Sequence, residues 1–260
     1  MKTDDDIEYA KTWLGEDVDC SSCAHASDLL PAGKCQLRRA CVNDRYARRI
    51  DRFFNWNPAL ANSYVRHEHF EVRAIAAKHA DVFFLKPLLT DPEETVRWNA
   101  ARRLPKRLIL PLRNDPHREV RIRIVSLLED AELAYMLADE DYYVRLVVAR
   151  RIAPPLLSRL VDDPEPEVRK VVAQRLPAEW LMCMAGDRSA AVRLEVAQRL
   201  APDLLPALAA DADWRVRYEV AGRVASSQLA PFLNDEDDFV REVARSRIEA
   251  GGQLLREMPL

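Results

Sequence analysis

The dipeptide Val-Arg recurs every 24 residues along most of this 260-residue chain. The eight copies in this register are Val72-Arg73, Val96-Arg97, Val120-Arg121, Val144-Arg145, Val168-Arg169, Val192-Arg193, Val216-Arg217 and Val240-Arg241. If each unit is started five positions before its valine, eight units of 24 residues fill positions 67 to 258 without a gap. A fixed period of this length is typical of proteins that stack one supersecondary unit on the next. The period therefore predicts a solenoid.

The pattern within one unit predicts two helical segments. The unit that starts at Asp91 reads DPEETVRWNAARRLPKRLILPLRN, and its residues are numbered here as places one to 24. Asp at place one is a favoured N-cap and Pro at place two suits a first helical turn, so we expect the helix to begin there. Apolar residues at places six, ten, eleven and fourteen share one face of an α-helix, which Pro105 ends. Places 18, 19 and 22 carry a second apolar group that suits a short helix of 3₁₀ character, and one example is Leu204, Leu205 and Leu208.

Neighbouring units are needed for folding, because one unit of 24 residues buries too little apolar surface alone. The first unit begins with His67 instead of Asp, and the last loses the apolar register after Ile248, as is expected of capping repeats. We predict an all-α fold in which eight repeats over residues 67–258, each an α-helix plus a short 3₁₀-like helix, follow a small cysteine-rich metal-binding domain over residues 1–66.

Four of the five cysteines lie in the segment CSSCAHASDLLPAGKCQLRRAC, where Cys20, Cys23, Cys35 and Cys41 give the pattern C-x2-C-x11-C-x5-C. A pair two residues apart lets one turn present two thiolates to the same metal. The other two follow a loop, the last of them on a helix that we expect from Gln36 onward. Four thiolates complete either a zinc site or a [4Fe-4S] site, and the spacing alone leaves both open.

The compartment in which we expect the protein makes disulfides less favoured than either zinc or an iron–sulfur cluster. The N-terminus, MKTDDDIEYA, is acidic and lacks the basic start and apolar stretch of a secretion signal, and no apolar run in the chain is long enough to span a bilayer. We therefore expect a soluble, cytoplasmic protein with no membrane association. In reducing surroundings a tight cysteine cluster binds metal more often than it forms structural disulfides.

Residues other than the four clustered cysteines are expected to have supporting or packing roles. His25 is interpreted as a neighbour of the metal site and not a ligand, because four thiols already complete the set. Cys183, far along the repeats, is interpreted as a small apolar side chain in the packing. Basic residues around the cluster are expected to offset its negative charge, with about half of them on a solvated helix face; they are Lys34, Arg38, Arg39, Arg45, Arg48, Arg49 and Arg52.

Arginine occupies place seven in all eight units, so stacking predicts a column formed by Arg73, Arg97, Arg121, Arg145, Arg169, Arg193, Arg217 and Arg241. In a structural interpretation each arginine binds an Asp or a carbonyl of an adjacent unit, whereas in a functional one the column binds phosphates of a nucleic acid. The 39 basic and 42 acidic residues nearly cancel, and an Asp starts nearly every unit. We therefore favour the structural interpretation, which argues against nucleic acid as a partner.

The repeat resembles two known families. Its D-P-x-x-x-V-R-x-x-A-A-R segment is similar to one helix of a HEAT repeat, but that repeat has two full helices in about 40 residues. All eight units more closely resemble the leucine-rich repeat variant family. That resemblance implies a right-handed superhelix of alternating α- and 3₁₀-helices without β-strands. Members of the family also carry an N-terminal cysteine domain with a [4Fe-4S] cluster, so the resemblance favours this cluster over zinc.

Three functions follow from these features. The favoured one is a redox-responsive or electron-transfer scaffold whose solenoid docks a protein partner. The alternatives are a zinc-capped scaffold for interactions alone and a HEAT-like protein that binds nucleic acid. The chain contains no nucleotide-binding loop, Ser/His/Asp set or His-Glu-x-x-His helix, so we expect it not to be an enzyme.

Overall fold

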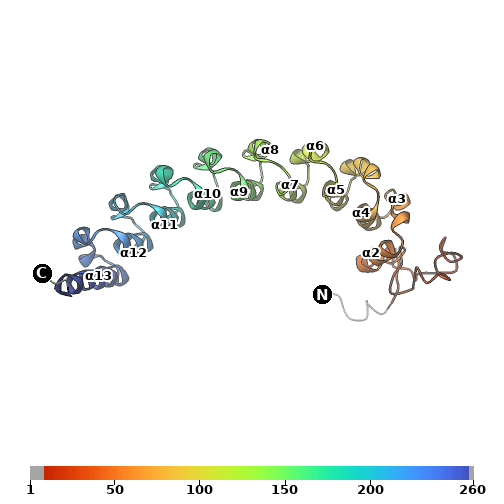
Figure 1. The fold of residues 1–260 in the computed structure, drawn as a ribbon, viewed down its shortest axis with the longest axis horizontal. Helices are drawn as coiled ribbons and strands as arrows, with labels where there is room; N and C mark the ends of the chain where they lie inside the picture. Colours follow the sequence, from red (N-terminus) through yellow and green to blue (C-terminus); the bar gives the residue numbers. More distant parts are fainter. Residues whose placement is uncertain (1–8, 258–260) are drawn as a thin grey trace. The chain divides into compact units, whose positions relative to one another are not determined.

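The computed structural model describes residues 9–257 (Figure 1). Its regular elements over these residues are α-helices and 3₁₀-helices, with two isolated β-bridges near the N-terminus. This confirms the predicted all-α repeat fold. The contacts divide the chain into two compact units, and Glu129 and Asp130 lie on either side of the division. The predicted domain boundary between residues 66 and 67 stays a prediction, and the predicted domain ends at residues 1 and 258 lie outside the described residues.

The first of these two compact units, each of which contains several repeats, ends at Glu129. Its helices are α2 (Ala47–Trp56), η1 (Pro58–Leu60), α3 (Ala61–Tyr64), α4 (Phe70–His79), η2 (Val82–Phe84), η3 (Lys86–Thr90), α5 (Glu94–Ala101), α6 (Lys106–Ile109), η4 (Leu110–Asn114) and α7 (Arg118–Ile124).

The second unit starts at Asp130. Its helices are α8 (Asp130–Leu133), η5 (Ala134–Met136), α9 (Tyr142–Arg151), η6 (Pro154–Leu160), α10 (Pro166–Arg175), η7 (Ala178–Met184), α11 (Ala190–Arg199), η8 (Leu205–Leu208), α12 (Trp214–Arg223), η9 (Ser226–Gln228), η10 (Ala230–Asn234) and α13 (Asp238–Glu257). Within the described residues, no helix is long and apolar enough to cross a bilayer.

Within each unit, the long helices of successive repeats pack side by side and the short helices form a second row (Figure 1). The core lies between the two rows. The valine at place six, for example Val96 and Val168, is fully buried, and so are the leucines at place 19 in several repeats, such as Leu157 and Leu181. Place 18 differs from the prediction, because Leu204 keeps 39% of its surface exposed whereas Leu205 and Leu208 are buried. The tight turn of a 3₁₀-helix directs only two of these three side chains inward.

The predicted N-cap is wrong. In the repeat that starts at Asp91 the helix begins at Glu94, place four, and its N-cap is Glu93. The carboxylate of Asp91 instead accepts the backbone N–H of Glu93 at 3.0 Å, which forms a turn ahead of the helix. The same carboxylate binds Arg73 of the preceding repeat, with N–O distances of 2.7 and 2.9 Å. Asp at place one therefore joins two repeats and does not cap its own helix.

Arginine at place seven supplies the other half of this junction. Arg97 donates from Nε and Nη2 to the two carboxylate oxygens of Asp115, both at 2.6 Å. Its Nη1 donates to the carbonyl of Asp91, at the start of its own repeat, at 2.8 Å. The same two-bonded ion pair joins Arg73–Asp91, Arg145–Asp163, Arg169–Asp187, Arg193–Asp211 and Arg217–Asp235.

Arg121 and Arg241 also contact the chain near their own helices. Arg121 donates from Nη1 to the carbonyl of Asp115 at 2.8 Å. Arg241 donates to the carbonyl of Asp235 and forms an ion pair with Asp238. All eight arginines are thus engaged by backbone or carboxylate oxygens, and these contacts favour the structural interpretation of the column.

A second set of arginines, at place thirteen of the repeat, also joins neighbouring repeats and was not predicted. Arg199 donates from Nη1 to the carbonyls of Ala173 and Leu176, at 2.6 and 2.8 Å, at the end of the helix in the preceding repeat. Arg103, Arg223 and Arg247 make both equivalent contacts, and Arg175 donates to the carbonyl of Ala149. These carbonyls have no partner inside their own helix, so each arginine caps a helix C-terminus.

Candidate metal centre

The four clustered cysteines lie in irregular chain that precedes α2. A turn carries the first pair, in which the backbone N–H of Cys23 donates to the carbonyl of Cys20 at 3.4 Å. A second turn leads to Cys35 and contains Gly33 at φ 66°, a left-handed conformation that glycine adopts without the steric cost of a side chain. The chain thereby returns on itself between the second and third cysteines.

The helix predicted from Gln36 onward is not present. Gln36 and Ala40 instead exchange two backbone hydrogen bonds of 2.8 Å, and Arg38 lies between them at φ 65°. This tight turn brings Cys41 back beside Cys35, and the helix begins only at Ala47. The left-handed residue interrupts a right-handed helix, which explains why the prediction is wrong.

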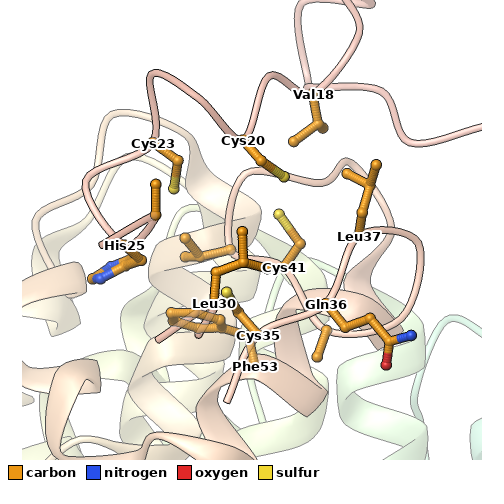
Figure 2. A pocket seen from close by; sticks show the side chains of 13 residues that line it. Val18, Cys20, Cys23, His25, Leu30, Cys35, Gln36, Leu37, Cys41 and Phe53 are labelled. Atoms are coloured by element: carbon orange, nitrogen blue, oxygen red, sulfur yellow. The ribbon is translucent and has the colours of Figure 1, made fainter. Parts of the chain in front are cut away.

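All four cysteines line one pocket, as Figure 2 shows. The wall is otherwise largely apolar and includes Val18, Leu30, Leu37 and Phe53. Cys41 is buried, whereas Cys20, Cys23 and Cys35 are partly exposed. Among the described residues, no three Cys, His, Asp or Glu side chains are grouped so as to hold a single metal ion.

The electrostatics of the pocket fit a positively charged metal group. Burial raises the pKa of the Cys41 thiol to about 11. Burial also raises the pKa values of Cys20 and Cys35, and the nearby charge of Cys23 raises both further. Thiolates that disfavour one another in an apolar pocket are stabilised when metal ions neutralise their charge. The donor set therefore suits a group that takes four thiolate ligands.

Polar residues around the pocket contact the cysteine segment. Asn43 directs its Nδ2 toward Cys23 Sγ at 3.5 Å, and such hydrogen bonds tune iron–sulfur centres. His25 lines the pocket, but its Nε2 lies 2.8 Å from the hydroxyl of Tyr64 in α3. The His25 ring also packs against Phe53, with centroids 5.5 Å apart. These contacts orient His25 as a neighbour of the thiols.

The basic residues that were expected to offset the cluster charge have different surroundings. Arg49 is buried and pairs with Asp44 at 2.7 Å, so its charge is already compensated. Arg52 donates to the carbonyl of Arg39 at 3.1 Å. None of the seven basic side chains lines the cysteine pocket.

Cys183 belongs to the second unit, in η7, and its side chain is exposed. The interpretation of this residue as a packed apolar side chain is therefore wrong. In the same helix Leu181 and Met184, at places 19 and 22, supply the buried contacts, and place 21 points away from them.

Comparisons with known proteins bear on both parts of the chain. Residues 10–63, which include all four clustered cysteines, match a family model described as "LRV protein FeS4 cluster". A solved structure titled "a leucine-rich repeat variant with a novel repetitive protein structural motif" is 40% identical, with a TM-score of 0.83, and the match covers 88% of this chain and 98% of that one. These matches confirm the family resemblance and the predicted iron–sulfur cofactor in place of zinc.

Part of the chain is also similar to a curated protein whose activity is not stated. It is the "uncharacterized 27.7 kDa protein in nifB 3'region" of Rhodobacter capsulatus, which is 47% identical over 93 residues. These residues are 36% of this chain, and the chain spans only 38% of the length of that relative.

Proposed function

We propose that this chain, which belongs to the leucine-rich repeat variant family, is an electron-transfer or redox-responsive scaffold whose repeats dock a protein partner. The observation that carries the proposal is the pocket lined by four cysteines, inside the segment that matches the FeS4 cluster family. Three of these cysteines are partly exposed, so one side of the pocket is accessible to a partner.

The ligands in this proposal are Cys20, Cys23, Cys35 and Cys41. When bound, a [4Fe-4S] cluster supplies one-electron redox chemistry. Phe53 and Leu37 cover part of the pocket and exclude water from it. Asn43 donates toward Cys23 Sγ, and this hydrogen bond offsets part of the negative charge on that thiolate.

The proposal is of a cytoplasmic scaffold and not of an enzyme. Partly exposed thiolate ligands are most durable in reducing surroundings. Protein is favoured over nucleic acid as the partner, because the arginine column is engaged within the stack. Arg193, for example, binds both carboxylate oxygens of Asp211 and is not free to contact a phosphate.

Reversible reduction tests the redox role. Anaerobically purified protein is reduced with dithionite and reoxidised with ferricyanide through several cycles, while the visible absorbance and the electron paramagnetic resonance spectrum are followed. A Cys41→Ser variant serves as the control and should give neither signal. The proposal expects reversible bleaching and a paramagnetic reduced state. Full iron content with no response anywhere between about −700 and +450 mV would show that the cluster is structural.

A further inference from the structure

A groove lined by arginines adjoins the candidate metal centre within the first unit. Its charged lining residues are Arg38, Arg45, Arg48, Arg49, Arg52 and Glu71. We call it the arginine groove. Five guanidinium groups and one carboxylate give it an excess of positive charge, although the chain as a whole has a net charge of −3.

The arginine groove and the cysteine pocket share two walls. In the turn between Gln36 and Ala40, Leu37 lines the cysteine pocket and the next residue, Arg38, lines the groove. In α2, Phe53 lines the pocket and Arg52 lines the groove. A molecule held in the groove is thus separated from the cysteines by one turn and one helix.

Three arginines in the groove have no carboxylate partner among the described residues. Arg38, Arg48 and Arg52 are exposed, and among the described residues their side chains donate one hydrogen bond, from Arg52 to the carbonyl of Arg39. Arg49, by contrast, is paired with Asp44. Exposed and uncompensated guanidinium groups that converge on one concave surface attract anions from solution.

The backbone at Arg38 indicates that its side chain is used. A φ of 65° favours glycine, and a non-glycine residue held there stores strain. Such strain is concentrated at functional sites. Glycine would close the same turn without strain, but it would remove a charge from the groove.

We propose that the arginine groove docks the carboxylate-rich surface of an acidic redox protein and so brings that protein against the metal centre. This inference rests on the proposed function. Guanidinium groups bind carboxylates through two parallel hydrogen bonds, and opposite charges steer the association of redox partners. Single-stranded nucleic acid fits the groove less well, because its bases stack on open aromatic faces. The aromatic residue of the groove, Tyr46, has Arg45 and Arg49 over its ring, at 5.8 and 4.8 Å.

The test measures binding of a fluorescein-labelled decaglutamate peptide to the full-length, cluster-containing protein by fluorescence anisotropy at low salt. Arg48→Glu should weaken binding on the order of tenfold, because it removes one attraction and adds one repulsion. The matched control is Arg107→Glu, which changes the same charge on an exposed arginine of α6 outside the groove. Equal effects of the two variants, or no peptide binding by the wild type, would overturn the proposal.

Two further measurements separate the alternatives. Arg38→Gly should weaken peptide binding without lowering the melting temperature, because it relieves the left-handed strain. A drop in both would assign Arg38 to folding and overturn its role in docking. If a labelled decathymidylate binds as tightly as the peptide, the partner of the groove is a nucleic acid and not an acidic protein. Peptide binding does not require reduction of the cluster. A negative result here can therefore be distinguished from a negative result in the redox test.

Discussion

The guanidinium of Arg97 and the carboxylate of Asp115 form two hydrogen bonds of 2.6 Å across the junction between two repeats. Only 6% of Arg97 and 4% of Asp115 are exposed. Such a pair fixes the register between two repeats through geometry as well as charge. Because Asp115 also accepts the backbone N–H of His117, one carboxylate positions both its own repeat and the preceding one.

The first prediction concerns removal of one partner from such a buried pair. Arg169 is 3% exposed and binds Asp187, so Arg169→Ala leaves a buried carboxylate without its cation. The cost is about 3–5 kcal/mol. In a chain of this size that lowers the melting temperature on the order of 10 °C, measured by circular dichroism. The control Arg150→Ala, at an exposed arginine, should leave it within a degree or two. A stable Arg169→Ala variant would contradict the structural role of the column.

The second prediction concerns the arginines at place thirteen. Arg199→Ala removes the donor for the carbonyls of Ala173 and Leu176. A hydrogen bond from a charged donor contributes about 1.5–3 kcal/mol, so the free energy of unfolding should fall by that order. Urea unfolding measures the change, and Gln198→Ala at the adjacent exposed position is the control. Equal stability of the two variants would show that water replaces this cap at no cost.

The third prediction is loss of stability in acid. The hydrogen bond from Arg217 holds the pKa of Asp235 below its ordinary value of 3.8. A carboxylate with a lower pKa in the folded state binds fewer protons folded than unfolded, so its stabilisation is present above about pH 5 and is lost as the pH falls below about 4. The melting temperature should therefore hold between pH 7 and 5 and then decline.

Two variants test whether the ion pairs between repeats cause this decline in melting temperature. Asp235→Asn removes the titrating group and should decline less steeply below pH 4 than the wild type. Asp203→Asn changes an exposed carboxylate and should follow the wild type. Identical slopes for all three proteins would mean that the ion pairs do not govern acid unfolding.

The repeat fold was predictable because its determinants are local and periodic. Valine at place six and the apolar residues at place 19 are buried in successive repeats, as the 3.6-residue pattern requires. The start of the helix was not predictable from capping preference. The carboxylate of Asp91 is occupied by Arg73, a tertiary contact that overrides the preference of Asp for an N-cap. The recurrence of arginine at place thirteen was visible in the sequence and would have indicated the second set of contacts.

The candidate site was predictable in composition and not in geometry. Spacing identified four cysteines as one set, and the structure places them around one pocket. Their arrangement depends on left-handed backbone at Gly33 and Arg38. Arginine rarely adopts this conformation, so the sequence offers no reason to expect the turn at Arg38. Cys183 lies on a short 3₁₀-helix, where buried and exposed positions adjoin one another. The apolar pattern of so short a helix does not predict which of its positions are buried.

The central claim is tested most directly by the iron and acid-labile sulfide content of anaerobically purified protein. We expect about four irons and four sulfides per chain, as a [4Fe-4S] cluster requires. Ser substitution of Cys20, Cys23, Cys35 or Cys41 should remove most of both, whereas Cys183→Ser should keep the full amount with the same circular dichroism spectrum. One zinc per chain with no sulfide, or a loss of iron in Cys183→Ser equal to that in Cys41→Ser, would contradict the account.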